Sequence, residues 1–405
     1  MREAVIVATA RTPIGRAFKG SLIDHRPDDL ATIAVQAALA KVPELDPHQV
    51  EDIMLGCGQP AGESGYNIAR VVAVLCGLTR VPGCTVQRYC SSSLQTIRMA
   101  AHAIRAGEGD VFVAGGVETV SRFKLGKADG HPNTRNPLFD TARARTATRE
   151  KGGAGPWTPA ADGELPDIYI AMGQTAENVA EHYNISREDM DAYAYMSQSR
   201  TAKALERGFF AEEITPVPRA DGTLITHDDS PRPSTTLEKL ATLKPVFRPD
   251  GRITAGNACP LNDGAAAVVV MSAERAKALG IKPLARIVAS AVTALDPEIM
   301  GVGPIEAIRA CLKRASMTIN GIDLVEINEA FAAQVIPSYR ALDIDPERLN
   351  VNGGSIALGH PFGMTGARIM TTLIHNLQDR DATFGLESMC VGGGQGMAMI
   401  VERLN

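Results

Sequence analysis

The stretch LQTIRMAAHAIRAGEGDVFVAGG, residues 94–116, decides the fold class of this chain. Its apolar residues recur at helical spacing over Leu94–Ile104, and a glycine-rich turn then leads into the apolar run Val111–Ala114. A helix followed directly by a short apolar run is typical of an α/β unit. The same order recurs near the C-terminus, where residues 365–377 have helical spacing and precede Glu387-Ser-Met-Cys-Val-Gly-Gly393. This echo predicts two copies of one α/β half.

On either side of this stretch, strand and helix patterns alternate in two regions. A middle region without this alternation separates them. Before residue 118, Ala4–Ala8 and Ile53–Leu55 predict strands and Leu30–Leu39 predicts a helix. Between about 119 and 250, the segment Lys124–Asp162 shows no sustained period, and two helical stretches and a proline-rich segment follow it. We therefore predict three parts: an N-terminal half (1–118 plus 251–271), an inserted cap (119–250) and a C-terminal half (272–405).

The composition excludes several classes of protein. The chain has 405 residues, of which 45% are hydrophobic, 21% are charged and 4% are aromatic, and its net charge is −5. Without a basic excess or aromatic platforms a nucleic-acid binder is not expected, and no apolar run is long enough to span a membrane. We find no secretory signal or C-terminal targeting motif and predict a cytoplasmic protein. Seven scattered cysteines without a C-x-x-C pair predict neither a disulfide framework nor a metal site.

Cys90 is the first candidate for chemistry. It lies in the polar turn Val86-Gln-Arg-Tyr-Cys90-Ser-Ser-Ser-Leu94, directly before a predicted helix. A thiol at a helix N-terminus meets the positive end of the helix dipole and free backbone N–H groups, which favour a thiolate and can hold a thioester oxyanion. The alternative is a buried, inert cysteine. Small polar neighbours favour the nucleophile, but this segment alone leaves both open.

Three further polar residues stand in glycine-rich or helix-start settings. His360 lies between a glycine and a proline in a turn before a helix, which by itself is more typical of a histidine that hydrogen-bonds a loop. Cys390 precedes three glycines, Gly392–Gly394, which indicate either close approach of a ligand or a hairpin. Asn328 ends a strand pattern, as a helix cap or as a binding group at a strand end.

Together these four residues resemble the active-site residues of the thiolase family. Two other segments carry the same resemblance: Thr254-Ala-Gly-Asn257 with Asn262-Asp-Gly-Ala-Ala266, and Met172-Gly-Gln-Thr-Ala-Glu-Asn178. The match extends over essentially the whole chain. It implies an α/β fold of two βαβαβαββ halves, packed as a five-layered α-β-α-β-α core with a cap (loop) domain inserted into the first half.

The resemblance also implies an acyltransferase that cleaves 3-ketoacyl-CoA. Cys90 would attack the keto carbon and keep the acyl group, Cys390 would protonate the departing acetyl-CoA enolate, and CoA would then take the acyl group. His360 and a water held by Asn328 would form one oxyanion hole, and the backbone N–H groups of Cys90 and Gly392 a second. Coenzyme A and acyl-CoA are then substrates, and no permanently bound cofactor or metal is expected.

Departures from the family pattern bear on the substrate. Ala171 stands where acetoacetyl-CoA-specific relatives have histidine, Cys259-Pro260 where they have Ser-Gly, and Ser93 where glycine is common. These differences favour a degradative 3-ketoacyl-CoA thiolase of fatty-acid β-oxidation, and the alternative is an acetyl-CoA C-acetyltransferase. The expected CoA contacts are Arg232, for which a solvated surface charge is the alternative, Met172 and Cys259.

The resemblance implies a homodimer or tetramer, and the basic loop 124–151 is a candidate docking site for a hydratase/dehydrogenase partner. Two other functions are weighed against thiolysis. A ketoacyl synthase pairs one cysteine with two histidines or with histidine and asparagine, and the second thiol at Cys390 disfavours it. A non-catalytic acyl-CoA or sterol carrier on the same scaffold is disfavoured because all four polar site residues are present.

Overall fold

The strands of both halves belong to one continuous sheet. The computed structural model describes residues 2–125, 134–153 and 155–405. Its main-sheet strands are β1 (Ala4–Arg11), β2 (Gly15–Arg16), β3 (Asp52–Gly56), β4 (Gly83–Val86), β5 (Val111–Thr119), β8 (Asn262–Ser272), β9 (Ala285–Ala294), β10 (Leu324–Ile327), β11 (Phe384–Val391) and β12 (Gln395–Arg403). They run in the order β10-β11-β12-β9-β1-β8-β5-β3-β4, with β2 on β8.

The halves meet through a short ladder between β1 and β9, in which Val5 lies opposite Arg286 and Ile6 opposite Ala285. Parallel pairing, which the alternation of strands and helices predicts, holds for β3 with β4 and β5 and for β10 with β11. The other ladders of the main sheet are antiparallel. The sheet is therefore mixed. In the second half β11 and β12 pair through a direct hairpin, whereas in the first half the inserted segment lies between the antiparallel partners β5 and β8.

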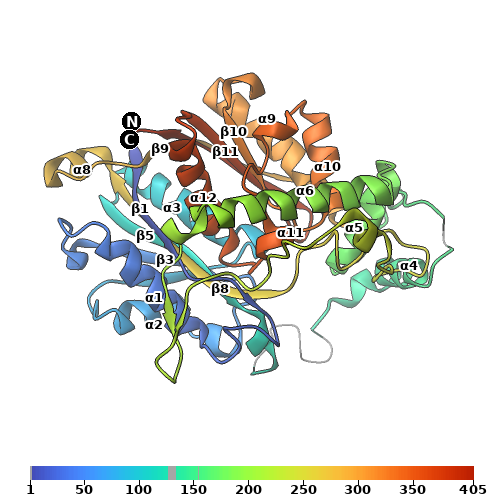
Figure 1. Ribbon diagram of the computed structural model, residues 1–405, viewed down its shortest axis with the longest axis horizontal. Helices are drawn as coiled ribbons and strands as arrows, with labels where there is room; N and C mark the ends of the chain where they lie inside the picture. The colour runs from blue at the N-terminus through green and yellow to red at the C-terminus, as the bar shows by residue number, and fades with distance from the viewer. Residues whose placement is uncertain (1, 126–133, 154) are drawn as a thin grey trace.

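Helices cover both faces of the sheet and also lie between its two halves (Figure 1). They are α1 (Pro27–Ala40), α2 (Ile68–Leu75), α3 (Ser92–Ala106), α4 (Asp140–Glu150), α5 (Met172–His182), α6 (Arg187–Glu206), α7 (Leu237–Ala241), α8 (Ala273–Leu279), α9 (Gly303–Ala315), α10 (Ala332–Ala341), α11 (Ser355–Leu358) and α12 (Thr365–Asp379). A small hairpin of β6 (Val217–Pro218) and β7 (Leu224–Ile225) occupies the proline-rich segment.

Three buried cores define the layers. The central core contains Leu94 and Ile97 of α3 together with Met370 and Leu373 of α12. Residues of α1 and α2 pack on the outer face of the first half's strands, and residues of α9 and α10 pack on the outer face of the second half's strands. The chain therefore has α, β, α, β and α layers in succession, and the predicted five-layered core is confirmed. The division of the chain by residue number stays a prediction.

Strand β8 illustrates how the sequence produces these layers. All eleven of its residues are buried. Val268 and Val270 face the central core, whereas Val269 and Met271 face the core under α1 and α2. Because successive strand residues point to opposite faces, an uninterrupted apolar run is required where both faces are covered.

The lack of a period predicted an irregular structure for Lys124–Asp162. The segment instead contains the helix α4. Only Ala142 and Thr146 of this helix are buried. They are four residues apart and therefore share one face, but neither is a large apolar residue. A helix that rests on so narrow a stripe gives no hydrophobic period. Residues 126–133 of the proposed docking loop 124–151 lie outside the described residues.

Candidate active site

Cys90 lies in a strained turn between β4 and α3. A single 3-10 turn, Tyr89–Ser91, joins the two elements, and Tyr89 has a φ of 41°. The Ser92 hydroxyl accepts a hydrogen bond from the backbone N–H of Arg88 and donates to the carbonyl of Tyr89. A left-handed φ in a residue other than glycine costs free energy and is held here by these bonds. The turn presents a buried Cys90 thiol at the start of α3.

Burial and two backbone N–H groups, of Gly392 and of Cys90 itself, act in opposite directions on the Cys90 thiol. Burial raises the pKa of the Cys90 thiol to about 12, although both N–H groups act to lower it. Burial outweighs the two N–H groups, so in this conformation the buried thiol favours its protonated form, against the expectation of a thiolate at the helix N-terminus. The thiol needs a base.

The hairpin between β11 and β12 brings a second thiol to the same place. Gly393 and Gly394 turn the chain with φ values of 77° and 76°, so the hairpin interpretation of the glycine run is confirmed. Cys390, one residue before the end of β11, donates its thiol hydrogen to Oε1 of Gln334 at 3.3 Å. Burial raises the pKa of Cys390 well above its ordinary value, and the nearby sulfur of Cys90 raises it further. Cys390 is therefore a neutral thiol.

His360 and Asn328 form the polar side of the site. The amide nitrogen of Asn328 lies 3.3 Å from Nε2 of His360, and Nδ1 of the imidazole lies 2.6 Å from the Thr365 hydroxyl. Burial lowers the pKa of His360 to about 3, and the nearby guanidinium of Arg368 acts in the same direction. The imidazole is consequently neutral, with a free lone pair on one ring nitrogen, and it is a weaker base in this buried site than an exposed histidine. Asn328 does not cap α10, because this helix begins four residues later with Phe331 in the capping position. That Asn328 is a binding group at a strand end stays a prediction.

The two central helices hold both sides of the site together. The Ser93 hydroxyl accepts a hydrogen bond from the backbone N–H of Ala367 at 2.9 Å, which ties the first turn of α3 to the first turn of α12. A methyl group on Gly366 would stand 2.4 Å from the backbone nitrogen of Leu94, so the helix ends touch. Ser93, a departure from the family pattern, therefore links the Cys90 turn to the helix that follows His360.

Comparison with known proteins identifies this arrangement. The thiolase N-terminal domain matches residues 4–274, and the thiolase C-terminal domain matches residues 281–403. The chain belongs to the thiolase family. It is therefore an enzyme of the acyltransferase class, and the resemblance inferred from the sequence is confirmed.

Three full-length comparisons illustrate the relationship. The chain is 43% identical to a 3-ketoacyl-CoA thiolase of Bacillus subtilis, with 99% of this chain and 100% of the relative aligned. It is 46% identical to a 3-oxoadipyl-CoA/3-oxo-5,6-dehydrosuberyl-CoA thiolase of Escherichia coli, with 100% of both chains aligned. The crystal structure of the Bacillus anthracis acetyl-CoA acetyltransferase superposes with a TM-score of 0.85 at 41% identity, covering 100% of this chain and 99% of that one.

Glu118 of this thiolase is a buried acidic residue that sequence reasoning missed. Its carboxylate accepts the backbone N–H groups of Gly58 (2.7 Å), Gln59 (3.2 Å) and Gly363 (2.9 Å), and Cys57 donates its thiol at 3.8 Å. Burial raises its pKa to about 7. The carboxylate thus joins the end of β5 to the loop that carries His360. The only signal in the sequence is an acidic residue inside an otherwise apolar strand pattern.

Glu329, beside Asn328, has a similar anchoring role in the thiolase. It accepts the hydroxyls of Tyr193 (3.0 Å) and Ser197 (2.6 Å) of α6, and the side-chain amide of Asn350 at 2.9 Å. These bonds fasten α6 to the strand end that carries Asn328.

The surroundings of the three predicted CoA contacts differ. Met172 begins α5, and both it and Cys259 pack against the core that contains Cys390. Arg232 lies elsewhere, where its backbone N–H donates to Oε1 of Gln198. Burial lowers the pKa of Arg232, and the nearby cation Arg16 of β2 adds to this effect. Arg232 is exposed, and its contact with CoA stays a prediction.

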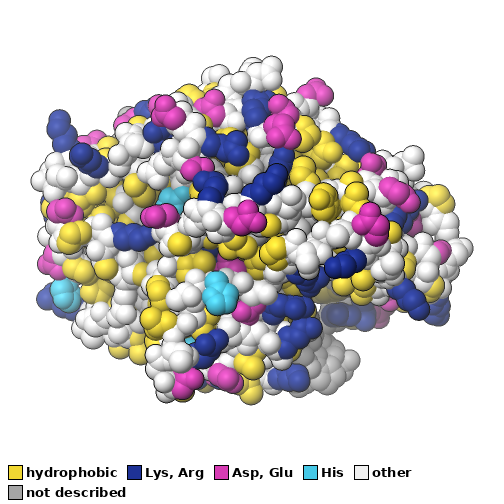
Figure 2. All heavy atoms as spheres, in the orientation of Figure 1, with side chains coloured by type: hydrophobic (Ala, Val, Ile, Leu, Met, Phe, Trp, Pro, Cys, Tyr) yellow, Lys and Arg dark blue, Asp and Glu magenta, His cyan; other side chains and the backbone are white. Residues whose placement is uncertain are grey.

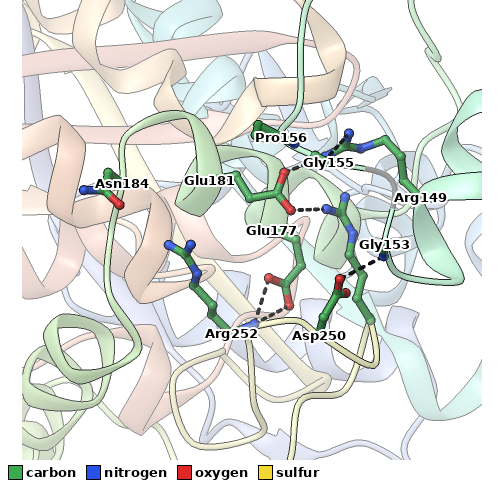
Figure 3. Close-up of a pocket in the computed structure, with 10 residues that line it drawn as sticks. Arg149, Gly153, Gly155, Pro156, Glu177, Glu181, Asn184, Asp250 and Arg252 are labelled. Atoms are coloured by element: carbon green, nitrogen blue, oxygen red, sulfur yellow. Dashed lines mark hydrogen bonds and ion pairs between the residues drawn. The ribbon is translucent and has the colours of Figure 1, made fainter.

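A separate polar cavity lies in the inserted segment (Figure 3). Its charged groups are paired with one another: Glu181 accepts from Arg248 at 2.7 Å, and Glu177 accepts from the backbone N–H of Arg252. These hydrogen bonds hold α5 against the chain around Asp250. None of the predicted site residues lines the cavity.

Charged and apolar side chains are mixed over most of the face shown in Figure 2, and Lys and Arg side chains gather in the lower middle of the view. Among the described residues, no helix combines the length and the apolar character that crossing a membrane requires.

Proposed function

We propose that this thiolase cleaves 3-ketoacyl-CoA with free CoA, giving a shortened acyl-CoA and acetyl-CoA. One observation carries the proposal: Gly392, two residues after Cys390, lies against the ring of Tyr89, which directly precedes Cys90. A nucleophile, an oxyanion donor and a proton donor therefore converge. Thioester chemistry with carbon–carbon cleavage needs these three groups in one place.

The proposed steps follow from the protonation states. Neutral His360 removes the proton of Cys90, and the thiolate attacks the keto carbon of the substrate. The bond between the α and β carbons breaks, the acyl group stays on sulfur, and Cys390 protonates the acetyl-CoA enolate at carbon. Cys390, now a thiolate, takes the proton of the incoming CoA thiol, and the CoA sulfur attacks the thioester. Cys90 leaves as a thiolate and takes its proton back from His360. The N–H groups of Cys90 and Gly392 stabilise the thioester oxyanion, and His360 with a water held by Asn328 stabilises the enolate oxygen.

For the substrate, we favour chains longer than acetoacetyl-CoA. Relatives named for 3-ketoacyl-CoA and 3-oxoadipyl-CoA align over the full chain. Ala171 caps α5 without a side-chain bond, beside Met172, where a larger polar residue would take up space. The alternative is an acetyl-CoA C-acetyltransferase, which the likeness to the Bacillus anthracis enzyme supports. We propose a role in fatty-acid β-oxidation because of the relative named for 3-ketoacyl-CoA. The relative named for 3-oxoadipyl-CoA acts on a dicarboxylic acyl chain.

Coenzyme A is proposed as a substrate that contacts Arg232, Met172 and Cys259. A cation near the cap surface suits phosphate, and the apolar surroundings of Met172 and Cys259 suit the pantetheine arm. We also propose a homodimer or a tetramer in the cytoplasm, where the seven free cysteines stay reduced. Docking of a hydratase/dehydrogenase partner on loop 124–151 is proposed on its basic character alone.

The deciding experiment measures the rate of thiolysis with CoA across a series of 3-ketoacyl-CoA substrates, from acetoacetyl-CoA to long chains and including 3-oxoadipyl-CoA. We expect kcat/KM to be higher for longer chains, and the Cys90→Ser variant to be inactive with every substrate. Activity confined to acetoacetyl-CoA would establish the acetyltransferase instead. Full thiolysis by Cys90→Ser would refute the proposed chemistry.

A further inference from the structure

A buried arginine reaches the site through a serine. Arg368, on the first turn of α12, is 1% exposed, and its Nη2 donates to the Ser355 hydroxyl at 3.0 Å. The Ser355 hydroxyl in turn lies 2.6 Å from Oδ1 of Asn328. Ser355 is fully buried at the start of α11. The two bonds connect a guanidinium in the middle layer of the fold to the amide that contacts His360.

The direction of these hydrogen bonds is fixed by chemistry. A guanidinium can only donate, so the Ser355 oxygen accepts from Arg368 and its single proton goes to Oδ1 of Asn328. The amide of Asn328 must then turn its NH2 group to Nε2 of His360, which accepts. A hydrogen-bond network is what assigns the orientation of an asparagine amide and the tautomer of a histidine.

The other side of the imidazole agrees with this direction. The Thr365 hydroxyl donates to the carbonyl of Pro361 at 2.7 Å, and a carbonyl can only accept. Thr365 therefore accepts the hydrogen on Nδ1 of His360. Every bond from Arg368 to Pro361 runs the same way, and the result is an imidazole whose lone pair is on Nε2.

Two carboxyl groups lie near Arg368. Glu326 of β10 and Glu387 of β11 are register partners on adjacent strands, and both are buried. Glu326 accepts from Asn376 at 2.9 Å, whereas neither oxygen of Glu387 has a hydrogen-bond partner among the described residues. Burial raises the pKa of both carboxyls and Arg368 opposes the rise. Both carboxyls therefore favour the protonated form, and Glu213 and Arg11 also act on the guanidinium of Arg368.

We propose that Arg368 is a positioning residue that, through Ser355, orients the amide of Asn328 and so keeps the lone pair of His360 on Nε2. This inference rests on the proposed function, because it assigns His360 as the base for Cys90. If Ser355 does not hold Oδ1, the amide can turn its oxygen to His360. The hydrogen of the imidazole is then on Nε2, and the Thr365 hydroxyl turns from the carbonyl of Pro361 to donate to Nδ1. The imidazole then cannot take the proton of Cys90.

The Ser355→Ala variant tests this positioning, since it cuts the connection without adding or removing a charge. Replacing Arg368 would be a poorer test, because it leaves two buried carboxyl groups without a counter-charge and threatens folding. The matched control is Thr371→Val, which deletes a buried hydroxyl from α12 whose bond, to the carbonyl of Ala367, stays within the helix.

Two readouts are compared: the rate at which iodoacetamide alkylates Cys90 in the absence of substrate, and the kcat and KM of thiolysis. For Ser355→Ala we expect alkylation and kcat to fall about 3- to 10-fold, the size of one net hydrogen bond, with KM within about twofold of the parent. Thr371→Val is expected to match the parent in both.

The inference is overturned if folded Ser355→Ala alkylates and turns over at the parent rate, or if Thr371→Val shows the same loss. The alkylation assay needs no acyl-CoA and therefore tests the positioning of His360 separately from thiolysis. A parent enzyme that alkylates at Cys90 but cleaves no 3-ketoacyl-CoA would refute the proposed function alone.

Discussion

A methyl group at Gly392 tests whether its N–H is a working part of the site. The φ of Gly392 is outside the left-handed region, so its backbone accepts alanine without strain. The new Cβ, however, would stand 3.3 Å from Cγ and Cδ2 of the Tyr89 ring. Contacts that close require a shift of a few tenths of an ångström. Tyr89 directly precedes Cys90 and is already held at a φ of 41°, so the shift changes how the sulfur meets the N–H.

The expected size of the effect follows from this displacement. Complete loss of one oxyanion donor costs about 10²–10³ in kcat, and a smaller misplacement costs part of it. We expect Gly392→Ala to lower kcat about 10- to 100-fold and to leave the thermal midpoint of unfolding within a few degrees of the parent. The assay follows loss of the 3-ketoacyl-CoA enolate absorbance at saturating CoA.

A double-variant cycle identifies the cause. If the contact with the Tyr89 ring is responsible, Gly392→Ala lowers kcat much less in a Tyr89→Ala background than in the parent. A Gly392→Ala enzyme with the parent kcat would refute the reasoning. So would a double variant in which the two losses simply multiply, because the effect would then not pass through Tyr89.

Three further predictions concern the second thiol, the buried carboxyl and the central layer. Cys390→Ala is expected to lower kcat for thiolysis about 10²- to 10⁴-fold while Cys90 is still alkylated by iodoacetamide, and loss of both would contradict separate roles. Glu118 has a pKa raised from 4.5 to about 7, so the folded state binds its proton more tightly and loses stability as the pH rises through this window. Between these pH values the free energy of unfolding in urea should fall by about 3 kcal/mol more for the parent than for Glu118→Gln. The same pH dependence of unfolding in both proteins would disprove this prediction. Leu373→Ala empties a fully buried position on α12 and should cost about 2–5 kcal/mol in urea unfolding, with a smaller cost excluding tight packing of the middle layer.

The local sequence determined those features that depend on neighbours in the chain. The helix spacing of residues 94–104 and the apolar run that follows were sufficient for an α/β unit, because each needs only its own period to be visible. The turn before α3, the glycine hairpin after Cys390 and the turn around His360 carry their signals in a few adjacent residues. The same motifs identified the family, and with it Cys90, Asn328, His360 and Cys390.

Only the tertiary structure decided the features that depend on distant residues. Glu118 meets Gly363, 245 positions away, and Arg368 reaches Asn328 through Ser355, contacts that no period or motif announces. The protonation states belong to the same class. A helix N-terminus predicts a thiolate at Cys90, but burial by the central layer raises the pKa of that thiol and lowers that of His360. Desolvation depends on everything packed around a group, which the order of residues along one segment does not contain.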